Sequence, residues 1–164
     1  MAKKKVDPLN RKYYQSVIAN LTVGDVKAAA AFYQKALGFK KRALMNGPDG
    51  KPMHAEFTLR GTTLMVGPEF PQYGARSPKS LGGSPVGLYV YVENADKAVA
   101  KAIKMGATAT VPVMDMFWGD RCGTVLDPDG HKWTLATHNA EPTPKEMKKK
   151  MKEQFGGMAA QAGG

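Results

Sequence analysis

Two short stretches of the sequence hold most of the residue types that could carry out chemistry. The first is MHAEF, residues 53–57, in which His54 and Glu56 stand two positions apart. A carboxylate beside an imidazole can raise the pKa of the ring and orient it as a general base. The second is MFWGDRCGTVLDPDGHKW, residues 116–133, with two tryptophans, three aspartates, a histidine and an arginine beside the only cysteine. This second stretch could form a metal site, a thiol nucleophile, or a hairpin whose polar residues mostly shape turns.

The elements that must position these residues occur twice along the chain. Each copy opens with a β-like run, SVIANLTV and then VGLYVYV, followed by an alanine-rich helix. Asp25 and Asn94 stand where the helices should be capped, and Gly38 and Gly106 stand where they should end. The runs KKRALMN, MHAEFTLRG and TTLMVG follow in the first copy, and TATVPVMDMF, RCGTVLD and HKWTLATH in the second. GPDG and DPDG are expected turns, so each half is predicted to be a βαβββ module.

The segments outside the two copies differ in composition from them. PEFPQYGARSPKSLGGSP contains four prolines and no periodicity, which indicates a linker. Near the end, TPKE at 143–146 is a capping box, and Met147, Met151 and Phe155 follow at four-residue spacing. The predicted domains are a basic tail at 1–12, a folded domain at 13–138, and a helix with a flexible tail at 139–164. Within the folded domain, module 1 covers about 13–67, the linker 68–85 and module 2 about 86–138.

Charge and cysteine content exclude several classes of protein. The formal net charge is +10, but more than half of it lies in the two ends, without a stripe of basic and aromatic residues. Nucleic-acid binding is therefore not expected. No apolar run approaches the roughly 20 residues that span a bilayer, so no membrane partner is expected. One cysteine cannot form an internal disulfide, and a cytoplasmic protein is predicted.

The repeat and its motifs resemble the vicinal oxygen chelate superfamily, which includes glyoxalase I, the bleomycin-resistance proteins and extradiol dioxygenases. MHAEF and the pattern FWGDR, DPDGHKW are similar to its PhnB-like branch, whose members are often labelled similar to 3-demethylubiquinone methyltransferase. The resemblance covers about residues 13–155. It implies an α+β fold in which two βαβββ modules form an open, cup-shaped curved mixed sheet, here with a C-terminal helix. It also implies a homodimer, with modules paired within one chain or across a swapped interface.

The resemblance also locates the metal ligands of the metal-using members, four residues from the first and last strands of each module. Carried over by helix register, these positions fall on Ile18, Met65, Gly87 and Thr134. A divalent catalytic ion needs three or more nitrogen or oxygen ligands with an open position, and none of these residues is a histidine or a carboxylate. We therefore predict a protein without the usual metal and without a cofactor.

Strand alternation predicts which side chains face the cup, because successive residues point to opposite faces. Arg121 stands where one strand turns into the next, and it could pair with Asp120 or clamp an anionic ligand. His131, Trp133 and Cys122 are interpreted as a turn residue, a core residue and a small buried thiol. The predicted ligand-binding residues are Asn20, Met65, Tyr89, Tyr91, Trp118, Arg121 and Thr134, and the predicted catalytic pair is His54 and Glu56.

Three functions fit these features. The first is a small-molecule-binding protein that holds a planar or anionic organic ligand in the cup. The second is a metal-independent lyase or isomerase in which His54 and Glu56 transfer protons and Arg121 stabilises developing negative charge. The third is a dimeric interaction protein whose basic tails contact a partner. A methyltransferase is not supported, because no glycine-rich nucleotide loop follows a strand.

Overall fold

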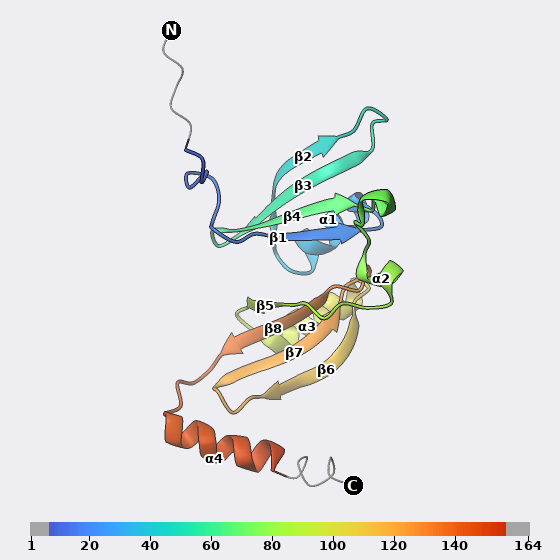
Figure 1. Ribbon diagram of the computed structural model, residues 1–164. Coiled ribbons are helices and arrows are strands. Elements are labelled where there is room, and N and C mark those ends of the chain that lie inside the picture. Colours follow the sequence, from blue (N-terminus) through green and yellow to red (C-terminus); the bar gives the residue numbers. More distant parts are fainter. Residues whose placement is uncertain (1–6, 157–164) are drawn as a thin grey trace. The chain divides into compact units, whose positions relative to one another are not determined.

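The computed structural model describes residues 7–156 and contains two compact units (Figure 1). The first unit ends at Ser84 and also includes Pro128–His131; the second begins at Pro85. Each unit contains one of the two predicted βαβββ modules and one four-stranded mixed sheet, which confirms the α+β class. The predictions for residues 1–6 and 157–164 lie outside the described residues.

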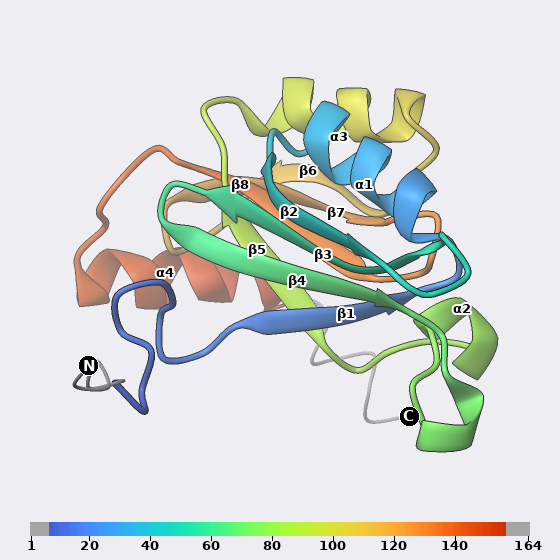
Figure 2. The same cartoon turned by 90° about the horizontal axis from the view of Figure 1, so that it is seen from above.

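The first module places one helix on one face of its sheet (Figure 2). Its elements are β1 (Ala19–Val23), α1 (Val26–Lys35), β2 (Lys40–Asn46), β3 (Pro52–Leu59) and β4 (Thr62–Pro68). The strand order is β1-β4-β3-β2, with β1 parallel to β4 and the other pairs antiparallel. The side chain of Asp25 caps α1 by accepting hydrogen bonds from the backbone N–H groups of Lys27 and Ala28, at 2.8 and 3.0 Å. Tyr33 and Phe57 meet edge to face in the core, with ring centroids 6.1 Å apart.

The second module repeats this plan. Its elements are β5 (Gly87–Tyr91), α3 (Ala95–Lys104), β6 (Thr108–Asp115), β7 (Asp120–Leu126) and β8 (Lys132–His138), in the strand order β5-β8-β7-β6. Asn94 caps α3 through a bond from the N–H of Lys97, as its position in the sequence predicts. Trp133 and Leu135 are buried beneath α3, which confirms them as core residues. The indole N–H of Trp133 donates to Asp127 at 3.0 Å, so its one polar atom is satisfied inside the core.

Three further helical elements lie outside the modules. The expected linker contains a 3-10 turn, η1 (Pro71–Tyr73), and a short helix, α2 (Pro78–Leu81). The C-terminal helix α4 (Pro144–Phe155) begins with the predicted capping box, in which Thr143 and Glu146 each bond the backbone N–H of the other. Within residues 7–156 no helix is long and apolar enough to cross a membrane.

Candidate functional site

Strand alternation separates each sheet into a face covered by its helix and a second face, here called the helix-free face. In the second module Val125 and Leu135 are buried on the helix side. The helix-free face carries the alternate residues of β5, β7 and β8. Strand register places Tyr89 opposite Thr134 and Asp120 opposite His138, so residues from three strands meet on this face.

Asp120 is the centre of this face. Its side chain is only 2% exposed, and its two oxygens accept four hydrogen bonds. The oxygen Oδ2 accepts from the hydroxyls of Tyr89 at 2.7 Å and Tyr91 at 3.1 Å, and from the indole N–H of Trp118 at 3.0 Å. The oxygen Oδ1 lies 2.8 Å from Nδ1 of His138. These five residues are called the Asp120 cluster below.

The electrostatics of the cluster favour an ionised Asp120. Burial alone would raise the pKa of this carboxyl, but hydrogen bonds from His138 and the aromatic donors lower the pKa below its usual value. The same contact with Asp120 raises the pKa of His138. Burial and then the hydrogen bond to Asp120 raise the pKa of Tyr89, so its hydroxyl stays protonated. The cluster therefore consists of one carboxylate surrounded by donors.

The two tyrosines present fixed rings to their surroundings. Their hydroxyls are held by Asp120, while Tyr89 is 46% exposed and Tyr91 is 49% exposed. The rings lie edge to face with centroids 5.5 Å apart, and the ring of Tyr91 also meets that of His138 at 6.3 Å. An aromatic surface that is anchored and still accessible suits contact with another ring system.

The turn before Asp120 brings the remaining parts together. Gly119 has φ +102°, a conformation that L side chains rarely adopt, and its carbonyl accepts the N–H groups of Asn139 and Ala140 at 3.0 Å. These bonds fix the chain after β8 against the turn, at the point where His138 faces Asp120. The sequence predicted a hairpin here, and the structure confirms it.

Arg121 lies on the other side of the sheet. Its guanidinium binds the carboxylate of Asp96 on α3 with two bonds of 2.7 Å and contacts Asp115 at 3.3 Å. The expected pairing of Arg121 with Asp120 is therefore wrong. Arg121 continues the alternation of β7, which places it on the helix side with Val125 rather than with the Asp120 cluster.

Three other residues complete the helix-free face of the second module: Thr124, Thr134 and Cys122. The hydroxyls of Thr134 and Thr124 lie 3.0 Å apart and bond to each other. Cys122 is buried, and burial raises the pKa of its thiol above the usual value. A protonated, buried thiol is a poor nucleophile, which agrees with its interpretation as a small packing residue.

The first module has a carboxylate in a similar setting. Glu56 is 8% exposed and lies 3.3 Å from Nε2 of His54, so the predicted pair is in contact. The hydroxyl of Tyr14 donates to Glu56 at 2.8 Å, and the guanidinium of Arg42 lies 3.6 Å from it. Burial opposes ionisation of Glu56, but these donors lower its pKa overall. The carboxylate is thus stabilised as an anion rather than prepared to accept a proton.

A sequence model of the Glyoxalase/Bleomycin resistance protein/Dioxygenase superfamily matches residues 15–135. The chain belongs to this superfamily. Uncharacterised proteins of Mycobacterium bovis and Mycobacterium tuberculosis are each 38% identical to it over 141 residues, covering 84% of this chain and 93% and 83% of theirs. A gene product from Arabidopsis thaliana has a TM-score of 0.62 at 28% identity, over 75% of this chain and 98% of that one. A superfamily member from Sphaerobacter thermophilus has a TM-score of 0.56 at 27% identity, over 73% and 94%.

The positions predicted for metal ligands in this superfamily member are Ile18, Met65, Gly87 and Thr134. Strand register places Asn20 opposite Met65 and Tyr89 opposite Thr134, whereas Gly87 lies opposite Lys132. The side chains of Ile18 and Gly87 offer no donor atom, and the thioether of Met65 and the hydroxyl of Thr134 do not match the nitrogen and carboxylate donors that hold a divalent catalytic ion. Across residues 7–156, no three His, Cys, Asp or Glu side chains gather in a way that could hold a metal ion. These four positions therefore do not supply the nitrogen and carboxylate ligands that the family resemblance implies for the metal-using members.

Four residues around Asp120 and Glu56 were not among the predicted site residues. They are Asp120, His138, Tyr14 and Arg42. Alternation along β7 and β8 could have placed Asp120 and His138 on the face of Tyr89, because both strands bring even-numbered residues there. Tyr14 precedes β1 and offers no periodic signal, so its contact with Glu56 depends on the tertiary fold.

Proposed function

We propose that the chain is a small-molecule-binding protein of the glyoxalase and bleomycin-resistance type, which lacks the usual metal quartet. Its planar organic ligand lies against Tyr89 and Tyr91 on the helix-free face of the second module. The observation that carries the proposal is the anchoring of both hydroxyls by the buried Asp120, which holds two half-exposed rings in place. A preformed aromatic surface lowers the entropy that binding must overcome.

The polar residues nearby define the ligand further. Trp118 and Thr134 stand on the same side of the sheet as the tyrosines and would contact the edge of the ligand. Arg121 is neutralised by two carboxylates on the helix side, so the basis for an anionic ligand on this face is weak. For the first module taken by itself, Asn20 and Met65, neighbours across β1 and β4, are proposed as ligand contacts of its own helix-free face. The ligand favoured here is planar and uncharged.

Titration with a planar fluorophore tests this proposal. We would add 2-naphthol to the full chain and to Tyr89→Leu and Tyr91→Leu variants, and follow its fluorescence. Each variant should weaken binding about threefold to tenfold, the range expected for loss of one ring contact. Tyr73→Leu is the matched control, because Tyr73 is 84% exposed on η1 and its ring makes no contact with Asp120 among the bonds of the described residues. Equal affinity in all three variants would contradict the proposal.

A second candidate function is that of a metal-independent lyase or isomerase. The contact of 3.3 Å between His54 and Glu56 favours it, because a carboxylate that orients an imidazole is a common arrangement for a general base. His54 would then exchange the proton, while Glu56, held as an anion by Tyr14, would position it. Turnover of a carbonyl substrate with a bell-shaped pH profile that His54→Ala abolishes would support this candidate over simple binding.

We also propose the PhnB-like branch, a homodimer and a cytoplasmic location for this chain. The branch rests on the FWGDR and DPDGHKW motifs, whose residues supply Trp118 and Asp120 to the cluster and Trp133 to the core. The dimer and the location are expectations from the family resemblance and from the single cysteine. A third possibility, an interaction protein with basic tails, predicts partner binding that depends steeply on salt. Light scattering of the full chain tests the dimer directly.

A further inference from the structure

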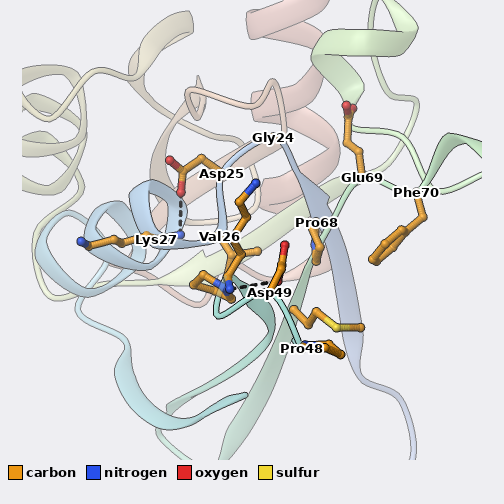
Figure 3. A pocket seen from close by; sticks show the side chains of 12 residues that line it. Gly24, Asp25, Val26, Lys27, Pro48, Asp49, Pro68, Glu69 and Phe70 are labelled. Atoms are coloured by element: carbon orange, nitrogen blue, oxygen red, sulfur yellow. Dashed lines mark hydrogen bonds between the residues drawn. The ribbon is translucent and has the colours of Figure 1, made fainter. Parts of the chain in front are cut away.

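A cleft in the first module lies apart from the helix-free face (Figure 3). It forms where β1 runs into α1, beside the turn between β2 and β3 and the end of β4, and its volume is about 700 Å³. Met53 and Pro68 line it, and both share the helix-side alternation of the buried Phe57 and Val66. The cleft therefore opens on the opposite side of the sheet from His54 and Glu56.

The wall of the cleft is mainly apolar. Its apolar side chains are Val26, Pro48, Pro52, Met53, Pro68 and Phe70. Met53 remains 42% exposed although it is a large hydrophobic residue of a central strand. The prolines hold their backbones in fixed conformations, so the wall needs little rearrangement to accept a ligand. A cleft of this size with an apolar wall suits the body of a small organic molecule.

The net charge of the residues that line the cleft is opposite in sign to the net charge of the whole chain. Three carboxylates and two ammonium groups line it, whereas the chain has a net charge of +10. Figure 3 shows Asp49 and the ring of Phe70 extending into the cleft, while Lys27 points away from it. Glu69 accepts the N–H of Ser77 at 2.7 Å. Hydrogen bonds from Ser80 and Ser77 hold the pKa of the Glu69 carboxyl at about 2, so this group stays ionised.

Asp25 and Asp49 each keep an oxygen available. Asp25 uses Oδ1 to cap α1, and Asp49 uses Oδ1 to accept the N–H of Lys51 at 3.0 Å. Among the bonds formed within residues 7–156, the second oxygen of each carboxylate has no partner. Over the whole lining, the three carboxylates outnumber the two ammonium groups by one. A carboxylate beside a half-buried aromatic ring forms a setting that favours cations.

We propose that this cleft is a second binding site, which takes an organic cation: an amine attached to an apolar or aromatic body. The ammonium group lies beside Asp49, and the body lies against Met53 and Phe70. The site is independent of the tyrosine surface of the second module, and the two proposals can fail separately.

Three probes that share a phenyl ring and differ in charge test the site. We would titrate the ¹⁵N-labelled full chain with 2-phenylethylammonium, 2-phenylethanol and 3-phenylpropanoate, and follow the amide resonances by NMR. The cation should bind tightest and shift the amides of Gly24, which lines the cleft, and of Gly47 and Gly50, which are the sequence neighbours of lining residues. Binding of the anion at equal or higher affinity, or shifts that avoid these amides, would overturn the proposal.

Two variants sharpen the test. Asp49→Asn keeps an oxygen that can accept the N–H of Lys51, so the turn should be preserved, but it removes the charge. It should weaken the cation about threefold to fivefold, as expected for a partly exposed ion pair, and leave the neutral probe unchanged. Glu93→Gln removes one exposed charge in the second module and should change neither affinity. If both variants weakened binding of the cation equally, the preference for a cation would come from the overall charge of the chain, and the proposed site would be wrong.

Discussion

The Nδ1 atom of His138 lies 2.8 Å from Oδ1 of Asp120, and this contact joins the end of β8 to the start of β7. It orients the imidazole, and it completes the set of four donors around a carboxylate that is almost fully removed from solvent. Such a group is stable only while its donors stay in place. The geometry of the tyrosine surface therefore depends on one buried charge.

Replacing Asp120 by Asn should destabilise the protein. The variant has one acceptor oxygen in place of two. Its NH2 group faces hydrogen-bond donors from which it cannot accept a bond. We expect the free energy of unfolding to fall by about 1–3 kcal/mol, the usual range when buried polar groups lose their partners. Urea denaturation measures this change, with Glu93→Gln as the control for loss of an exposed charge. An Asp120→Asn variant as stable as the wild type would show that the cluster is not a structural centre.

The contribution of His138 to stability should depend on pH. Its hydrogen bond to Asp120 raises the pKa of the imidazole in the folded state above the ordinary value of 6.5. A group with a raised folded pKa stabilises the fold fully below its unfolded pKa, and this stabilisation is lost as pH rises through the folded pKa. The melting temperature of the wild type should therefore exceed that of His138→Gln most at about pH 5.5, and the gap should shrink by about pH 9. A gap that widens at alkaline pH would contradict the assigned contact.

Gly119 should not tolerate a side chain. A Cβ atom there would collide with the carbonyl of Ala140, and the residue has φ +102°. We expect Gly119→Ala to lower the free energy of unfolding by about 2–4 kcal/mol, since strain and a backbone collision act together. Gly82→Ala is the matched control, because Gly82 has φ +83° with open space around it, and it should lose about 1 kcal/mol. Thermal denaturation compares the two, and equal losses would show that the collision is relieved.

Arg121 should stabilise the fold modestly and should not affect the ligand. Its partner Asp96 is 53% exposed, so the pair is partly screened by solvent. We expect Arg121→Gln to lower the free energy of unfolding only slightly, as is typical of exposed ion pairs. Binding of 2-naphthol should be unchanged, because the guanidinium lies on the helix side. A large loss of affinity for 2-naphthol in this variant would show that Arg121 contributes to the binding face.

The sequence was sufficient for the elements that follow local rules. The caps at Asp25, Asn94 and Thr143 formed as predicted, because each depends on a side chain bonding its own first helical turn. The buried faces of β3 and β8 also followed alternation, which explains Phe57 and Trp133. These features need no knowledge of distant contacts.

The predicted alternative in which Arg121 pairs with Asp120 failed, because the expected start of the strand was one residue too late. The strand was expected to begin at Arg121, with the preceding residues in a turn, but β7 begins at Asp120. Once Asp120 is part of the strand, alternation places Asp120 on the face of Tyr89 and Arg121 on the face that α3 covers. The contact of Tyr14 with Glu56 could not be predicted in this way, since it joins segments 42 residues apart without a periodic pattern.

The most direct test of the proposed function is an NMR titration of the chain carrying ¹³C-labelled tyrosine rings with 2-naphthol. Ring-current shifts should appear at Tyr89 and Tyr91, grow together with the bound fraction, and disappear in Asp120→Asn, in which the hydroxyl anchor is altered. Tyr73 and Tyr14 should stay unchanged. Shifts confined to Tyr14, or no shift at Tyr89 and Tyr91 at saturating probe, would show that the ligand does not bind on this surface.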